Sequence, residues 1–124
     1  MKCSVSQIAK VLSGEIFEFP EGRKSYCGFK SAKIVNDLDV SILLTDSRSL
    51  LYPSATIFFA LLTKGNDGHR YIETLYRQGV RNFVVTAIPK EMTDIRDANF
   101  IIVSDTLTAL QILGMYSRYN SPAD

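Results

Sequence analysis

The sequence has few of the residues from which metal centres and active sites are built. Among its 124 residues there is one histidine, His69, and there are two cysteines, Cys3 and Cys27, which lack the Cys-x-x-Cys spacing of a zinc or redox motif. This pattern argues against a metal site and favours two reduced thiols, while a disulfide between them stays open. His69 has no nucleophile or metal partner near it in the sequence, so we expect it to be exposed and without a catalytic role.

A long apolar run and an excess of one charge are also absent. The longest apolar run, residues 57–62, is far shorter than the ~20 residues of a membrane helix, and residues 1–4 do not begin an apolar signal segment. We therefore predict a cytoplasmic protein without membrane contact. Because 14 Lys and Arg residues face 13 Asp and Glu residues, no overall basic field favours nucleic acid, and an anionic ligand would have to be bound by local groups.

The length fits one domain, and the apolar pattern predicts alternating helices and strands within it. Helices are predicted to begin after three capping sites: Ser4, then Asn66 or Asp67, then Ser104 or Asp105. Strands are predicted at 15–19, 40–44, 57–62, 80–86 and 99–103, and residues 20–39 are expected to form a surface excursion. This order indicates a layered α/β domain with a largely parallel sheet.

Two polar clusters follow two of the predicted strands. Residues 45–48 read Thr-Asp-Ser-Arg, and residues 64–68 read Lys-Gly-Asn-Asp-Gly. In parallel sheets, ligands usually lie beyond the carboxyl ends of the strands, where both clusters would be. The second cluster suits an anion at a helix start, and the first suits a polar heterocycle. On spacing alone, however, both clusters are better explained as structural turns, with Asp46 and Arg48 as a local pair.

Taken together, the clusters resemble the amino-terminal domain of the Mur ligases, which are bacterial amide ligases of peptidoglycan precursor synthesis. The resemblance rests on T-D-S-R, a turn with proline, F-F-A-L, K-G-N-D-G-H-x-Y-I and G-V-R-N-F-V-V, and it extends over residues 40–116. The pattern is most similar to the branch that adds D-alanyl-D-alanine to UDP-N-acetylmuramoyl-tripeptide, including forms fused to an alanine racemase. The branch that adds the third peptide residue shares the pattern, so the choice between the two branches stays open.

The resemblance implies a three-layer α/β/α domain over residues 1–119, with residues 120–124 as a linker stump toward an ATP-binding central domain. It implies that this domain holds the UDP part of the precursor. The residues expected to contact UDP are Thr45 and Ser47, near the uridine, and Lys64, Gly65 and Asn66, facing the diphosphate. The residues expected to brace the site are Asp46, Arg48 and Asp67.

The chain lacks the glycine-rich ATP loop, G-x-x-x-x-G-K-[ST]. We therefore expect no cofactor and no catalytic residue in this chain, and no activity from it alone. ATP and Mg²⁺ would be bound by the central domain of the same polypeptide, and the expected partners are that domain, the carboxyl-terminal domain and, in fused forms, a racemase domain. A noncatalytic regulatory or interaction module stays open as an alternative. A free-standing small enzyme is disfavoured, because no nucleophile, base or metal set is present.

Overall fold

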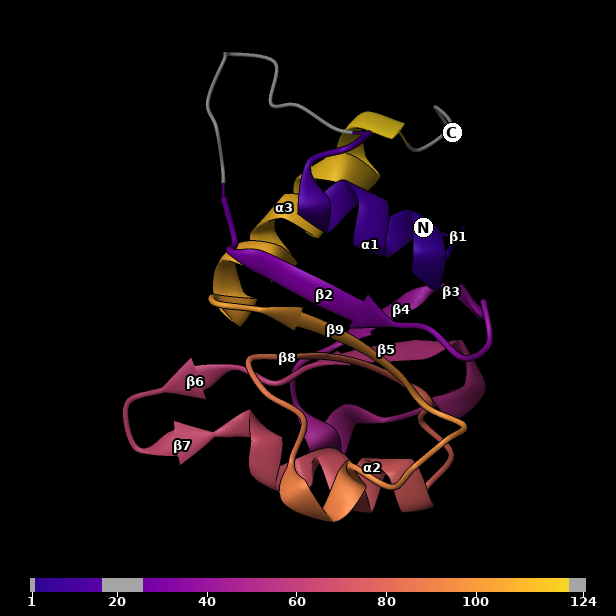
Figure 1. Cartoon of the computed structure of the whole chain (residues 1–124), viewed down its shortest axis with the longest axis vertical. Helices are drawn as coiled ribbons and strands as arrows, with labels where there is room; N and C mark the ends of the chain where they lie inside the picture. The colour runs from indigo at the N-terminus through magenta and orange to yellow at the C-terminus, as the bar shows by residue number, and fades with distance from the viewer. Residues whose placement is uncertain (1, 17–25, 121–124) are drawn as a thin grey trace.

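The computed structural model describes residues 2–16 and 26–120 and has a five-stranded sheet as its middle layer (Figure 1). The strand order is β2-β9-β8-β5-β4. Four strands are parallel: β4 (Ile42–Leu44), β5 (Thr56–Phe59), β8 (Asn82–Val85) and β9 (Asn99–Val103). The edge strand β2 (Phe29–Lys33) is antiparallel to β9. The predicted α/β fold with a mainly parallel sheet is confirmed.

Helices cover both faces of this sheet and complete three layers (Figure 1). On one face lie α1 (Val5–Ser13) and α3 (Thr106–Asn120), and on the other lies α2 (Ile72–Arg77). In the described part of the chain, short 3-10 helices occupy four connections: η1 (Ser47–Ser49), η2 (Pro53–Ala55), η3 (Gly68–Tyr71) and η4 (Lys90–Met92). Two small antiparallel pairs accompany the sheet: β1 (Cys3–Ser4) with β3 (Asp39–Val40), and β6 (Leu62–Thr63) with β7 (Asn66–Asp67).

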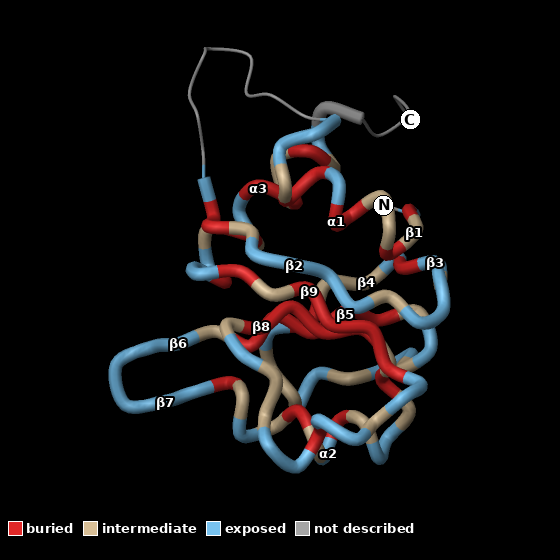
Figure 2. The backbone as a smooth tube through the Cα atoms, in the orientation of Figure 1, coloured by how far each residue is buried: buried red, intermediate tan, exposed pale blue. Residues whose placement is uncertain are grey.

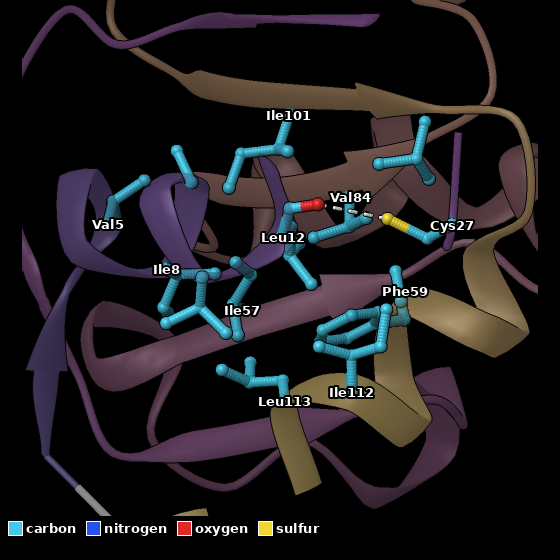
Figure 3. Packing of buried hydrophobic residues seen from close by; sticks show 14 of the residues in the cluster. Val5, Ile8, Leu12, Cys27, Ile57, Phe59, Val84, Ile101, Ile112 and Leu113 are labelled. Atoms are coloured by element: carbon cyan, nitrogen blue, oxygen red, sulfur yellow. Dashed lines mark hydrogen bonds between the residues drawn. The ribbon is translucent and has the colours of Figure 1, made fainter. Parts of the chain in front are cut away.

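The strands are apolar on both sides because each face of the sheet has its own core. Ile57 and Phe59 of β5 pack toward α1 and α3 (Figure 3), whereas Phe58 between them packs toward α2. Figure 2 shows the buried strands between the two helical layers. Within the described residues, no helix has both the length and the apolar composition needed to cross a bilayer.

Both cysteines lie in the core under α1 and are free thiols. Cys27 donates a weak hydrogen bond to the carbonyl of Leu12 at 3.4 Å (Figure 3). Burial is the main cause that raises the pKa of both thiols, so neither is a reactive thiolate at neutral pH. The expectation of two reduced thiols is confirmed.

The helix starts follow the predicted capping residues. Ser4 accepts a hydrogen bond from the Gln7 amide at 3.2 Å, and Gly14, with a φ of +87°, ends α1. At α3, Asp105 rather than Ser104 is the cap, because its carboxylate accepts from the amide of Thr108 at 3.1 Å and from its hydroxyl at 2.8 Å. The Thr108 amide and then the hydroxyl lower the pKa of the Asp105 carboxyl.

We expect Asp105→Ala to lower the free energy of unfolding by about 1 kcal/mol at pH 7, since a lost helix cap typically costs that much. The lowered pKa means that this stabilisation is present above the pKa of unfolded aspartate, about 3.9, and is lost as the pH falls through the folded value. Urea unfolding of the wild type and of Asp105→Ala should therefore show that the difference in their free energies of unfolding becomes smaller from pH 7 to pH 3. Ser104→Ala is the control, and an equal loss there would assign the cap to Ser104.

The sequence-based strand boundaries were wrong at several places. Glu15 and Ile16 lie outside any strand, and the rest of the predicted strand at 15–19 lies outside the described residues. The excursion at 20–39 contains β2, which has no apolar period because this edge strand is mostly exposed; residues 20–25 are outside the described residues. The strand at 40–44 is interrupted at Ser41, and the one at 57–62 ends at Phe59 because Leu62 enters the β6–β7 pair.

Candidate functional site

A pocket of about 470 Å³ lies beyond the carboxyl end of β4. Residues from both polar clusters line it, together with one tyrosine: Thr45, Asp46, Ser47, Arg48, Asn66 and Tyr71. These residues range from half-buried to exposed, so the pocket is open to solvent. The structure therefore brings the two polar clusters together, as their position after parallel strands predicted.

The first wall of the pocket is the turn that leaves β4. Asp46 caps η1 by accepting a hydrogen bond from the Arg48 amide at 3.0 Å. The same carboxylate accepts from Nε and Nη2 of Arg48 at 3.1 and 3.0 Å, which gives a two-pronged ion pair. The Arg48 guanidinium and then its amide lower the pKa of the Asp46 carboxyl, so the pair stays charged at neutral pH. The cap and the ion pair thus hold together the turn that contains Ser47, and a bracing role of Asp46 and Arg48 toward a ligand stays a prediction.

Arg48 is also the cation of the pocket lining. Its side chain is 88% exposed, and its guanidinium carries five N–H donors, of which Asp46 engages two. The carboxylate of Asp46 partly offsets this charge, so a ligand would meet a directed set of donors more than a strong positive field. The arrangement suits hydrogen bonding to a polar, weakly or moderately anionic molecule.

The second wall comes from a short β-hairpin, β6–β7, which we call the arm (residues 62–67). The arm projects from the body in Figures 1 and 2, and all its residues are exposed. Asn66 of the arm accepts a long hydrogen bond from the hydroxyl of Tyr71 at 3.4 Å. The guanidinium of Arg70 lies 5.7 Å from the centroid of the Tyr71 ring. The Asn66 amide and the Tyr71 ring therefore stand side by side in the lining of the pocket.

Asp67 and His69 connect the arm to the fold. Asp67 caps η3 by accepting from the His69 amide at 2.9 Å, which confirms the predicted capping role. Partial burial raises the pKa of the Asp67 carboxyl, but the bonds from the amide and ring of His69 outweigh this and lower it. The prediction of an exposed His69 is wrong: its side chain is only 13% exposed, because the ring packs between Asp67 and Thr86.

The predicted site residues separate into two groups. Thr45, Ser47 and Asn66 line the pocket, whereas Lys64 and Gly65 form the turn of the arm and do not line it. Gly65 has a φ of +87°, which accounts for the glycine at this turn. The roles of all five residues toward a ligand stay predictions.

Sequence reasoning missed Tyr71 as a pocket residue. Tyr71 directly precedes the buried Ile72 in an apolar helical pattern, which indicates packing, and its side chain is half-buried in the structure. The available signal was its position two residues after His69, within the D-G-H-x-Y-I motif. Among the described residues, no group of three or more His, Cys, Asp or Glu side chains could hold a metal ion.

No protein-family model matches the sequence, and no curated protein matches it either. Solved structures do match. Crystal structure I of MurF from Acinetobacter baumannii has a TM-score of 0.65 at 20% sequence identity, with 96% of this chain and 22% of that chain covered. Crystal structure II of MurF from the same organism has a TM-score of 0.69 at 20% identity, with 96% and 21% covered. The chain has the fold of a part of MurF.

A third match is the UDP-N-acetylmuramoylalanyl-D-glutamyl-2,6-diaminopimelate–D-alanyl-D-alanyl ligase of Acinetobacter baumannii, with a TM-score of 0.65 at 20% identity. This chain spans only 22% of that structure, so most of MurF has no counterpart in the 124 residues. The predicted fold, that of a Mur ligase domain, is thereby confirmed. In this fold, the structure joins the two polar clusters in one pocket.

Proposed function

We propose that the pocket holds the UDP part of UDP-N-acetylmuramoyl-tripeptide. In this proposal the chain is the substrate-binding part of an ATP-dependent amide ligase that adds D-alanyl-D-alanine during peptidoglycan precursor synthesis. The observation that carries the proposal is the meeting of residues 45–48 with Asn66 and Tyr71 in one pocket at the carboxyl end of a parallel sheet. The shared fold with MurF supports this assignment.

The pocket has the groups that a uridine would need. A uracil ring presents one imide N–H donor between two carbonyl acceptors, and a carboxamide such as that of Asn66 offers both an acceptor and donors. Because Asn66 lines the same pocket as Thr45 and Ser47, we assign it to the base and not to the diphosphate that the resemblance implied. The hydroxyls of Thr45 and Ser47 can donate to and accept from the ribose or the base. The Tyr71 ring supplies an apolar surface against which a flat heterocycle can pack.

The diphosphate would extend from the pocket along the arm. Arg48 lies in the pocket lining, whereas Lys64 and Gly65 lie further out, at the turn of the arm. The positive side chains of Arg48 and Lys64 would therefore contact successive parts of an extended ligand. Charge-assisted hydrogen bonds to phosphate oxygens from both residues fit this path. ATP and Mg²⁺ would act in a central domain, where ATP phosphorylates the peptide carboxylate and the amine of D-alanyl-D-alanine attacks the acyl phosphate.

Calorimetric titration with UDP tests this proposal. We expect weak binding of UDP, and we expect Ser47→Ala and Asn66→Ala each to weaken it roughly 2- to 10-fold, since a neutral hydrogen bond contributes about 0.5–1.5 kcal/mol. Ser54→Ala is a matched control, because Ser54 is exposed on η2 and does not line the pocket. ADP at the same concentration controls for binding of the diphosphate alone.

The proposal fails if millimolar UDP gives no heat of binding above that of dilution. It also fails if Ser54→Ala weakens binding as much as Ser47→Ala does. Equal affinity for UDP and ADP would leave no role for Asn66 and Tyr71 in reading the base, and the pocket would then be a general phosphate site.

A further inference from the structure

We infer that His69 is the positioning residue of the pocket: in its neutral Nδ1–H tautomer it ties the arm to the end of β8 and so fixes Asn66 and Tyr71. The inference rests on the proposed function for the identity of the ligand only. The tautomer and the fixing of the arm are properties of the protein itself and can be measured without a ligand.

The arm needs such a tie because packing does not hold it. Its residues, 62–67, are all exposed, and even its apolar residue, Leu62, is 58% exposed. The paired register of the arm is only two residues long, Leu62 with Asp67 and Thr63 with Asn66. A hairpin this short is marginal in water on its own. The direction of the arm must therefore be set where it joins the body.

At that junction the two ring nitrogens of His69 bond to different parts of the fold. Nδ1 lies 2.6 Å from Oδ1 of Asp67, at the base of the arm. Nε2 lies 3.0 Å from the backbone nitrogen of Thr86, the residue that follows β8. The imidazole thus spans the gap between the arm and the central sheet, and its low exposure keeps water from competing for either bond.

These partners determine where the ring proton is. The amide of Thr86 can only donate, so Nε2 must accept and carries no proton. The remaining proton of the neutral ring is then on Nδ1, where it donates to the Asp67 carboxylate. The hydroxyl of Thr86, 3.2 Å from Nε2, adds a second contact at the same nitrogen.

The same geometry separates His69 from a catalytic histidine. A carboxylate, an imidazole and a hydroxyl stand in line, which is the order of groups in a hydrolase triad. A general base, however, needs the lone pair of Nε2 for the hydroxyl proton, and here the Thr86 amide occupies it. The arrangement fixes a position and does not activate a nucleophile.

The residues that His69 holds are those of the second pocket wall. Asn66 precedes Asp67 in the chain, and Tyr71 is two residues beyond His69. Loss of the bond to Thr86 would leave the packing of Gly68 against Ala60 and Leu61 to hold the arm and η3 on the body. The distance from this wall to Thr45 and Ser47 would then be less closely set. His69 therefore acts on a ligand through Asn66 and Tyr71 without touching it.

Two substitutions test the two hydrogen bonds of the His69 ring separately. In His69→Gln, the longer side chain brings an amide oxygen close to the place of Nε2, so it can accept from the Thr86 amide. In His69→Asn, the shorter side chain brings an amide NH₂ close to the place of Nδ1, so it can donate to Asp67 but does not reach Thr86. Thr86→Val is the control, because it removes the hydroxyl and keeps the amide.

The experiment combines ring ¹⁵N spectra, amide hydrogen exchange and UDP titration. The wild-type ring should show a protonated Nδ1 and an unprotonated Nε2. The Thr86 amide should exchange slowly in the wild type, His69→Gln and Thr86→Val, and faster in His69→Asn, with residues 62–67 more mobile there. UDP affinity should fall about tenfold in His69→Asn, which is the effect of losing one hydrogen bond to the ligand, and less than about threefold in His69→Gln and Thr86→Val.

A ring protonated at Nε2 would overturn the inference, as would a His69→Asn protein whose arm order matches that of the wild type. If His69→Asn does not fold, the tautomer of the wild-type ring and the exchange of the Thr86 amide in His69→Gln and the wild type still test the inference. If the wild type binds no UDP while the tautomer and arm order are as expected, the proposed ligand is wrong and the positioning role stands. If the wild-type arm is ordered but His69→Asn binds UDP as tightly as the wild type does, His69 has no role in UDP binding.

Discussion

Asn99→Leu is expected to lower the free energy of unfolding by about 3 kcal/mol or more, because each buried polar group left without a partner costs about 1–3 kcal/mol. Asn99 is fully buried at the amino end of β9. Its side-chain nitrogen donates to the carbonyl of Asn36 at 2.6 Å and to Oδ1 of Asn82 at 2.9 Å. Its Oδ1 accepts from the amides of Val35 and Asn36 at 2.8 and 3.1 Å. Leucine can make none of these four bonds.

Urea unfolding of the wild type and of Asn99→Leu measures this loss. Asn36→Leu is the matched control, since its side chain is exposed and its backbone makes the bonds to Asn99. We expect the control to stay within about 0.5 kcal/mol of the wild type. Equal losses in the two variants would show that the amide network does not stabilise the amino ends of the strands.

Gly68→Ala is expected to lower the free energy of unfolding by about 1–3 kcal/mol, as overpacking at a rigid site does. Gly68 is buried where the arm turns into η3, and its amide donates to the carbonyl of Leu61 at 2.8 Å. A Cβ at this position would lie 2.8 Å from the backbone nitrogen of Leu61 and 3.0 Å from Cα of Ala60. Because both neighbours are backbone atoms of the segment that follows β5, the junction itself must shift.

That shift should also weaken UDP binding, because Gly68 lies between the two residues of the second pocket wall. Gly114→Ala is the control for this substitution: nothing lies within 4 Å of a Cβ at that position in α3, so the better helix propensity of alanine should stabilise the protein by up to about 1 kcal/mol. Thermal unfolding and UDP titration of both variants check the pair. A stable Gly68→Ala protein with unchanged UDP affinity would contradict the close packing of the junction.

The parts of the fold that depend on local chemistry could be predicted from the sequence. Ser4 and Asp67 cap helices by bonds to residues two or three positions away, so the caps are visible in short motifs. The strand Asn99–Val103 matches the prediction at both ends because its apolar run is bounded by polar residues. In contrast, β2 is a strand only because it pairs with β9, more than 60 residues later, and its own residues are mostly exposed.

The site was predictable in position and not in detail. The two polar clusters were placed at the carboxyl ends of neighbouring strands, and the structure joins them in one pocket. The arm was missed because residues 62–67 combine an apolar start with a polar end, which fits both the end of a strand and a loop. The role of His69 was missed because its partner Thr86 is 17 residues away, and no local spacing connects the two.

A map of backbone amide shifts during a titration with UDP tests the proposed binding pocket most directly. If the pocket binds UDP as proposed, the largest shifts occur at residues 45–48, at Asn66 and at Tyr71, while amides around Asn82 and Asn99, at the opposite ends of the strands, stay in place. Shifts confined to those opposite ends, or no shifts at millimolar UDP, would contradict the proposed binding.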